Sequence, residues 1–314
     1  MNGPSSLWIR LTRRLQAAPQ PVWGASRLWR NLGLGLGAIA LFALVTALRS
    51  PAHAYEVQIT PTTPQLGDTV SVLVTPARPG TSPQVTVRGQ TYPTYALPGN
   101  RFRALIPTSP LDAPGRVVVQ VTGEEETRNL AVELRNRSFP VQRITLSPGR
   151  AGLEATDYEV SRMDALKALR TPTKYWSGPM SRPNRGRVSS EFGIRRYYNG
   201  EFAENYYHRG VDYADGTGSP ILAPAAGRVV LVGRVQDGFV LNGNTVGIDH
   251  GQGVASVMIH LSRIDVSEGD FVQPGQQIGA MGDTGFATGP NLHWGLYVNG
   301  IAVDPAPWRN GSIE

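Results

Sequence analysis

Histidine and aspartate residues in the C-terminal part of the sequence have the types needed to bind a metal ion. His208 is followed four residues later by Asp212 in YYHRGVDYADG, and His293 lies in TGPNLHW. Two histidines and one carboxylate, with a fourth position left open, form the ligand set of a catalytic zinc ion. Because the sequence has no cysteine, a metal site must use such ligands. These residues therefore predict a Zn²⁺ site.

The spacing of His208 and Asp212 sets a condition on the backbone. A straight strand would separate positions i and i+4 by about 13 Å, which is too far for two ligands of one metal. Gly210 lies between them and permits a bend that brings the imidazole and the carboxylate together. This motif alone is a weak signal, since a lone histidine is usually structural.

Asn291 stands two residues before His293, at the start of an apolar run. Residues two apart on a strand point to the same face, so both side chains are expected to face the same site. Asparagine does not titrate, but its amide can donate a hydrogen bond. The pair therefore predicts one metal ligand beside one neutral polar group.

Longer motifs place this pattern in a family. In order, the motifs are SSEFGIRR (189–196), HRGVDYA (208–214), APAAGRVV (223–230), IDHGQGVASVMIHLS (248–262), VSEGDFVQPGQQIGAMGDTG (266–285), ATGPNLHW (287–294) and VDPAPW (303–308). Over residues 177–309 the sequence resembles the M23 zinc metallopeptidases of the lysostaphin or LytM type. The resemblance implies a small antiparallel β domain with a groove, and cleavage of peptide bonds in peptidoglycan.

The resemblance also implies roles for single residues. His208, Asp212 and His293 match the zinc ligands of the family. His260 matches a catalytic histidine that orients the attacking water and stabilises the oxyanion. Asn291 stands where the family has the first histidine of its H-x-H motif, and here the sequence departs from the pattern.

Four further positions have less effect on the predicted chemistry. Met258 stands where the family often has tyrosine, which affects packing more than chemistry. His250, in IDHG, is expected to be structural and to hold a turn. Arg195 and Arg196 could meet acidic groups of the cell wall, although a solvated surface role is the default expectation.

The substitution at Asn291 leaves three alternatives: full activity through His260, reduced activity, or a zinc-binding protein without activity. Loss of a positioned general base typically costs about 10²–10⁴ in rate. All three ligands and His260 are retained, and this favours an enzyme. The predicted function is an exported zinc metalloendopeptidase that hydrolyses cross-links or stem peptides of peptidoglycan. The alternative is a catalytically impaired cell-wall binding protein or a regulator of other hydrolases.

The segments APAAGRVVLVG and VSEGDFVQPGQQIG are also similar to those of carrier domains. Lipoyl and biotinyl carriers have similar turns but need a lysine for attachment. No lysine follows Lys174 in this chain, which excludes this class.

The formal net charge of +6 arises from the first 54 residues. They contain six arginines and no acidic residue, and the remaining sequence has 24 basic and 24 acidic residues. The charge therefore does not indicate nucleic-acid binding. An uncharged run at 31–48 and the tripeptide Ala52-His53-Ala54 follow the arginines, which predicts a signal peptide or an uncleaved signal anchor. Either leader would export the chain to the periplasm or cell wall, and only this segment would contact the membrane.

The rest of the sequence predicts an all-β protein of two domains. Residues 55–146 contain six short strand patterns separated by turn residues, as in an immunoglobulin-like sandwich (56–60, 69–74, 84–89, 101–106, 116–122 and 129–135). Residues 147–187 form a linker with one short helix, roughly 156–170, which begins at the capping box TDYE. Residues 188–314 form the M23-type zinc peptidase domain, and no helix of useful length is expected there.

Overall fold

The computed structural model describes residues 55–123, 126–145, 153–311 and 313. The predicted leader at 1–54 lies outside these residues. Among the helices that are described, none has both the length and the apolar character that a membrane span requires.

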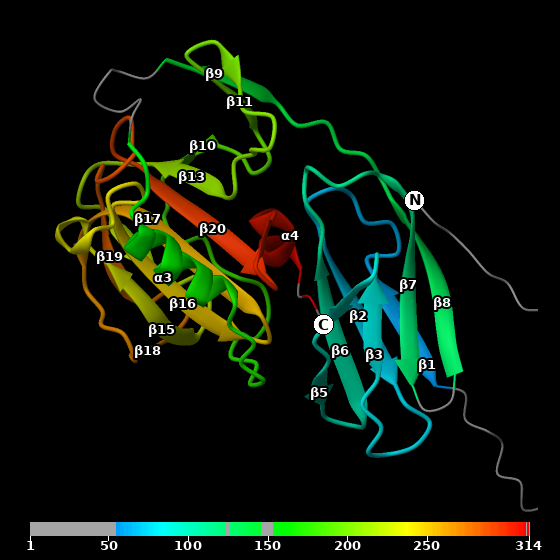
Figure 1. The fold of residues 1–314 in the computed structure, drawn as a ribbon. Coiled ribbons are helices and arrows are strands. Elements are labelled where there is room, and N and C mark those ends of the chain that lie inside the picture. Colours follow the sequence, from blue (N-terminus) through cyan, green and yellow to red (C-terminus); the bar gives the residue numbers. More distant parts are fainter. Residues whose placement is uncertain (1–54, 124–125, 146–152, 312, 314) are drawn as a thin grey trace, which may run out of the picture. The chain divides into compact units, whose positions relative to one another are not determined.

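The first domain consists of two antiparallel four-stranded sheets (Figure 1). One sheet has the order β1-β2-β6-β5, with β1 (Glu56–Thr60), β2 (Thr69–Thr75), β6 (Arg101–Pro107) and β5 (Tyr95–Leu97). The other has the order β4-β3-β7-β8, with β4 (Gln90–Tyr92), β3 (Gln84–Val87), β7 (Gly115–Gly123) and β8 (Glu126–Leu134). Valines of both sheets, among them Val72, Val85 and Val121, share one buried core. The fold is thus the predicted sandwich. The three-residue strands β4 and β5 were not foreseen, and Val141–Ile144, which the prediction included in this domain, pairs with neither sheet.

The second domain is built on a ten-stranded sheet whose main order is β10-β13-β20-β17-β16-β15-β18, with β14, β19 and β21 paired beside this path. The bounds are β10 (Arg187–Ser190), β13 (Val211–Ala214), β14 (Pro220–Leu222), β15 (Gly227–Gly233), β16 (Asn244–Gly251), β17 (Val254–Ile264), β18 (Phe271–Val272), β19 (Gln277–Met281), β20 (Leu292–Val298) and β21 (Ile301–Val303). The central strands β16, β17 and β20 are almost entirely buried. Both faces of these strands are covered over most of their length, and the exposed positions are Ser262 and Arg263 at the end of β17.

A small second sheet lies next to the large one. It has the order β12-β11-β9, with β12 (Glu201–Phe202), β11 (Arg195–Tyr198) and β9 (Val141–Ile144). Strand β9 pairs in parallel with β11, with Gln142 opposite Arg196. The pairing joins segments more than fifty residues apart, and no local pattern in the sequence predicts it.

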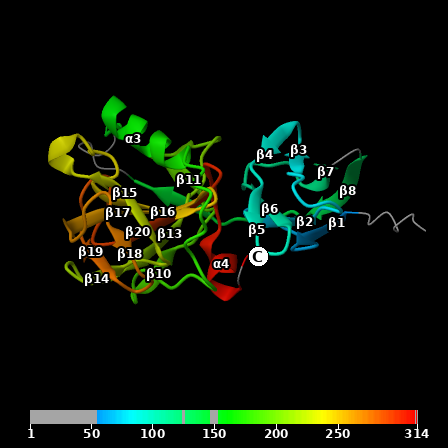
Figure 2. The same cartoon turned by 90° about the horizontal axis from the view of Figure 1, so that it is seen from below.

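Helix α3 (Asp157–Lys167) corresponds to the predicted short helix. Thr156 caps it by accepting a hydrogen bond from the backbone N–H of Glu159 (3.1 Å). Met163 and Leu166 are buried in the core of the second domain, so the helix packs on the β15–β16 side of the large sheet (Figures 1 and 2). A Cβ at Gly247 would lie 2.3 Å from Leu166, which explains why the strand has a glycine where the helix crosses it.

Two short helical segments complete the described chain. The 3₁₀ turn η1 spans Val235–Asp237, and helix α4 spans Pro305–Asn310. Asp304 caps α4 through the N–H of Ala306 (2.8 Å), and proline occupies the first turn. Helix α4 has six residues, which are too few for a periodic signal in the sequence.

Candidate metal centre and its cleft

Strand pairing brings two of the predicted ligands together. Asp212 on β13 lies directly opposite His293 on β20 in an antiparallel ladder. Directly opposed side chains in such a ladder are about 4.5–5.5 Å apart at Cβ and lie on the same face. Two residues separated by eighty positions in sequence thus become neighbours through the register alone.

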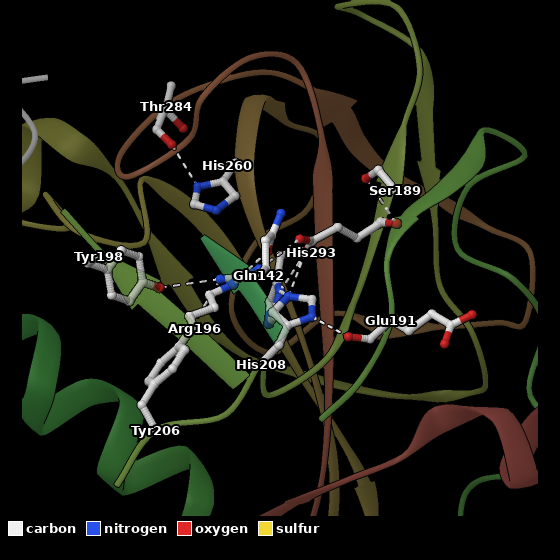
Figure 3. A network of polar contacts seen from close by, with 11 residues as sticks. Gln142, Ser189, Glu191, Arg196, Tyr198, Tyr206, His208, His260, Thr284 and His293 are labelled. Carbon is white, nitrogen blue, oxygen red and sulfur yellow. Dashed lines mark hydrogen bonds and ion pairs between the residues drawn. The ribbon is translucent and has the colours of Figure 1, made fainter. Parts of the chain in front are cut away.

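His208 completes the group from the segment that precedes β13. Its Nε2 lies 2.9 Å from Oδ1 of Asp212 and 3.0 Å from Nδ1 of His293, and that Nδ1 lies 2.8 Å from the same carboxylate oxygen (Figure 3). The possible ligand atoms of the three residues all lie within 4.8 Å of one another. Two imidazole nitrogens and a carboxylate oxygen that converge in this way fit a divalent cation such as Zn²⁺.

Backbone contacts hold His208 in the orientation that a ligand needs. Its Nδ1–H donates to the carbonyl of Glu191 (2.7 Å), which orients the ring with Nε2 towards Asp212 and His293. The backbone N–H of His208 donates to the carbonyl of Ile194, and its own carbonyl accepts from Gly193 (both 2.9 Å). The segment 191–194 of the motif SSEFGIRR therefore fixes this histidine on both sides.

Gly210 has a different role from the bend that the sequence suggested. Its φ is not in the left-handed region, but a Cβ built on it would lie 2.3 Å from the carbonyl oxygen of Trp294 and 2.8 Å from Cε1 of His293. Glycine is required here because the backbone carrying His208 runs directly against β20. This close approach brings His208 within reach of both other ligands.

The protonation states suit metal ligands. Burial alone would raise the pKa of the Asp212 carboxyl, but hydrogen bonds with His208 and His293 hold that pKa well below its usual range. Burial lowers the pKa of His293 below its ordinary value, against the effect of Asp212. The carboxylate is thus ionised and the His293 imidazole is neutral at neutral pH.

His260 lies on β17 and lines the same cleft. Its Nδ1–H donates to the carbonyl of Thr284 (2.8 Å), which leaves Nε2 as a hydrogen-bond acceptor (Figure 3). Its φ of 70° lies in the left-handed region, which is uncommon for a residue with a side chain. Burial, assisted by His293, lowers the pKa of His260 to about 4, so its imidazole is neutral at neutral pH.

A carboxylate from helix α3 supports the backbone around His260. Glu159 is fully buried and accepts hydrogen bonds from the N–H groups of Leu241 (3.0 Å) and Asn242 (2.6 Å). The carbonyl of Asn242 in turn accepts the N–H of His260 (3.0 Å). The capping box predicted only a capping role for Glu159, and its contact with the loop at 241–242 cannot be predicted from local spacing.

Asn291 lies just before β20 and also lines the cleft. Its backbone N–H donates to the carbonyl of Gly282 (3.0 Å). Its side-chain Oδ1 is buried and has no hydrogen-bond partner among the described residues. A buried amide oxygen without a partner is costly, so this atom is available to a ligand or water in the cleft.

Arg196 corrects one sequence-based expectation. It is not a solvated surface residue: its side chain is 11% exposed and its Nη2 lies 3.7 Å from Oδ2 of Asp212. Its neighbour Arg195 does not line the cleft and donates to the carbonyl of Glu204. The place of Arg196 beside Asp212 was not foreseen, because it depends on the pairing of β11 with β9.

The cleft around these residues has a volume of about 640 Å³. It contains all five predicted site residues together with Arg196 (His208, Asp212, His260, Asn291, His293 and Arg196). The fourth histidine of the domain, His250, lies apart from it. Its Nδ1–H donates to the carbonyl of Ala226, and its Nε2 accepts from the hydroxyl of Ser256 (both 2.8 Å), as expected for a structural residue.

Comparisons with known proteins agree with this geometry. Residues 206–305 match the model of peptidase family M23. The chain is 39% identical over 120 residues to the DD-carboxypeptidase/endopeptidase Mpg of Neisseria meningitidis serogroup B, a match that covers 38% of this chain and 26% of the relative. It is 40% identical over 121 residues to the peptidoglycan DD-endopeptidase ShyC of Vibrio cholerae, with the same coverage of 38% and 26%. The chain thus spans about a quarter of the length of these relatives.

A solved structure extends the likeness beyond the cleft. A crystal structure described as a candidate M23 peptidase from Pseudomonas aeruginosa superposes with a TM-score of 0.58 at 27% identity. The match covers 81% of this chain and 97% of the other. Together with the family match and the all-β architecture, this likeness shows that residues 206–305 are a peptidase M23 domain.

Proposed function

We propose that this chain is an exported zinc metalloendopeptidase that hydrolyses peptide bonds of bacterial peptidoglycan. The observation that carries the proposal is the convergence of His208, Asp212 and His293 within 4.8 Å in a cleft that also holds His260. Relatives named as peptidoglycan and DD-endopeptidases support the substrate class. The basic and then apolar leader at 1–54, which ends in Ala-His-Ala, supports export.

The proposed division of the chain follows the sequence. The sandwich at 55–146 would position the M23-type domain at 188–314 on the cell wall, and residues 147–187 would join them. The packing of α3 into the core of the second domain supports a rigid attachment of this part of the linker to the peptidase domain.

Three side chains would hold the metal. A Zn²⁺ ion bound by His208 Nε2, Asp212 Oδ1 and His293 Nδ1 would supply Lewis acidity and lower the pKa of a water molecule to about 7. Asp212 and His293 are already in the protonation states that this requires, since the carboxylate is ionised and the imidazole is neutral. Little reorganisation is then needed on binding.

His260 is the proposed proton carrier. With Nδ1–H fixed on Thr284, its Nε2 can accept a proton from the attacking water and return it to the leaving amine. A pKa near 4 makes His260 a weak base but an effective acid once protonated. The positive φ holds the imidazole in the cleft rather than along the regular pleat of β17.

Asn291 is proposed to replace the proton-transferring histidine of the family with a neutral polar contact. Its Oδ1 has no partner among the described residues and can accept a hydrogen bond from the attacking water. The NH₂ group of the same amide can donate to the developing oxyanion. In this proposal Asn291 positions reactants and leaves proton transfer to His260.

The competing candidate is a zinc-binding wall protein or regulator without activity. It is favoured by one observation, the asparagine at position 291. The retention of His260 in a strained conformation beside the ligands argues against it, since metal binding alone would not require that residue.

Digestion of purified sacculi by the full-length, zinc-loaded protein tests the proposal. Mass analysis of the released peptides should show new amino termini for the wild type and none for His293→Ala. His260→Ala should bind zinc normally but cleave about 10²–10⁴ times more slowly. Normal zinc binding without cleavage, and without recovery in Asn291→His, would instead establish the regulator.

A further inference from the structure

Arg196 is a buried cation in the wall of the catalytic cleft that the proposed hydrolysis does not use. It lies on β11 and its side chain is 11% exposed. Arginine keeps its charge under all ordinary conditions, and a buried charge is retained only where something compensates it. The anion that compensates the charge of Arg196 therefore bears on the function of the cleft.

The guanidinium is held in one orientation by neutral groups. Nε donates to Oε1 of Gln142 (3.1 Å), and Nη1 lies 3.4 Å from Oη of Tyr206 and 3.5 Å from Oη of Tyr198 (Figure 3). An amide and two phenols orient the group without neutralising it. The remaining nitrogen, Nη2, is directed to the metal site.

Asp212 is the only carboxylate within ion-pair distance of Arg196 in the described part of the chain, with 3.7 Å between Nη2 and Oδ2. The other oxygen, Oδ1, faces His208 and His293. Once this carboxylate binds a divalent cation, its single negative charge is shared with two positive ones. It then no longer compensates Arg196.

The rest of the cleft does not supply another anion. Among the described lining residues, three are cationic and three are anionic, so a bound divalent cation leaves a net charge of +2 (Lys167, Arg196, Arg209, Glu159, Asp164 and Asp212). Glu159 is engaged by the backbone N–H groups at 241 and 242, and Asp164 pairs with Lys167 at 3.0 Å. A positively charged cleft favours an anionic substrate.

We propose that Arg196 binds a free carboxylate of the peptide substrate, within one or two residues of the bond that is cleaved. The inference rests on the proposed peptidase function and specifies its substrate. Nη2 is one contact away from a metal ligand, and an extended chain advances only about 3.3–3.6 Å per residue, so a carboxylate on Arg196 must lie close to the scissile bond. The planar fork of arginine suits carboxylate recognition, and its fixed position lowers the entropy lost on binding.

Paired peptides that differ only in this charge test the assignment. An acetylated D-alanyl-D-alanine peptide is prepared as the free acid and as the C-terminal amide. Binding is measured by calorimetry on the full-length, zinc-loaded protein in a His260→Ala background, which slows turnover. The acid should bind more tightly than the amide by about 10–100-fold, and Arg196→Gln should abolish this difference.

Arg195→Gln is the matched control, because it removes the neighbouring arginine, which lies outside the cleft. It should keep the full preference for the acid. Zinc content is determined for each variant. If Arg196→Gln loses zinc, Arg196→Lys is tested instead, because lysine keeps the charge and should retain a weaker preference for the acid.

Equal binding of acid and amide by the wild type would overturn the proposal, as would an unchanged preference in Arg196→Gln. Failure of the proposed function looks different. In that case the wild type would leave sacculi intact while still preferring the acid. Cleavage of sacculi without any preference would reject the role of Arg196 and leave the peptidase function standing.

Discussion

The predicted ligand set depends on Gly210. Glycine is needed there because there is no space for a side chain, and not because the backbone conformation requires it. At Gly210 the chain carrying His208 passes so close to β20 that any side chain would meet the carbonyl of Trp294 and the ring of His293. The backbone must then move away from β20, and His208 moves with it. A shift of a few tenths of an ångström is enough to disturb a tetrahedral site.

Gly210→Ala should therefore lower the affinity for zinc about 10–100-fold, the size of effect seen when groups that support a metal ligand are removed. Titration with zinc, followed by calorimetry, measures this. Gly216→Ala is the matched control, because a Cβ there meets nothing within 4 Å and its φ is not in the left-handed region. Equal zinc affinity in the two variants would contradict the packing argument.

Single residues were predictable from the sequence where their motif was continuous. His208 and Asp212 stand in one short motif, and all five predicted site residues line one cleft. Arg196 was not predictable, because its position is set by Gln142, fifty-four residues earlier in the chain and on another strand. Gly210 was predicted to permit a bend, whereas in the structure it permits close approach to β20. Such an approach between distant segments cannot be recognised in the local sequence.

At the scale of elements, α3 contributes to the cleft as well as to the core. Its buried Glu159 binds two backbone N–H groups of the loop at 241–242, and that loop accepts the N–H of His260. The carboxylate thereby stabilises the unusual backbone of the proposed proton carrier. A helix expected to serve as a linker is thus connected to the chemistry through two hydrogen-bonded steps.

Glu159→Gln should reduce kcat about tenfold with little change in KM or zinc content. The amide has a single acceptor oxygen, so one N–H of the loop loses its partner, at a cost of about 1–3 kcal/mol. Steady-state kinetics on a soluble peptide separates kcat from KM. Asp157→Asn, on the exposed first turn of the same helix, should leave both unchanged; if Glu159→Gln behaves like this control, the loop does not position His260.

The elements themselves were largely predictable, for a physical reason. Strands such as β2, β17 and β20 contain several apolar residues within a few positions, and this is a local feature of the sequence. Strands β4, β5 and β9 have three or four residues, too few for a periodic signal. Their existence depends on a partner strand rather than on their own sequence.

At the scale of the whole molecule, the buried His250 links stability to pH. Burial lowers its pKa to about 4 in the folded protein, whereas an unfolded chain has a value near 6.5. Between about pH 6.5 and pH 4, the imidazole of His250 is therefore protonated in the unfolded state and neutral in the folded state. The stability from this residue is present above pH 6.5 and is lost as the pH falls towards 4.

Urea unfolding of the metal-free protein at pH 7 and pH 4.5 should show a contribution of about 2–3 kcal/mol from this effect. His250→Gln should be less stable than the wild type at pH 7, because the hydrogen bonds to Ala226 and Ser256 are disturbed, but its stability should depend less on pH. The wild-type and variant curves should approach each other at low pH. Parallel curves would show that His250 is already protonated in the folded state.

The direct opposition of Asp212 and His293 also has a consequence for how the chain folds. Successive residues of a strand point to opposite faces, so a slip of one residue between β13 and β20 would turn one of the two ligands away from the other. Misaligned forms would then lack a chelating site, and only the correctly aligned sheet could take up zinc. Zinc present during refolding should therefore bind only to molecules with the correct strand register. It should shift the equilibrium towards these molecules and away from those with other pairings.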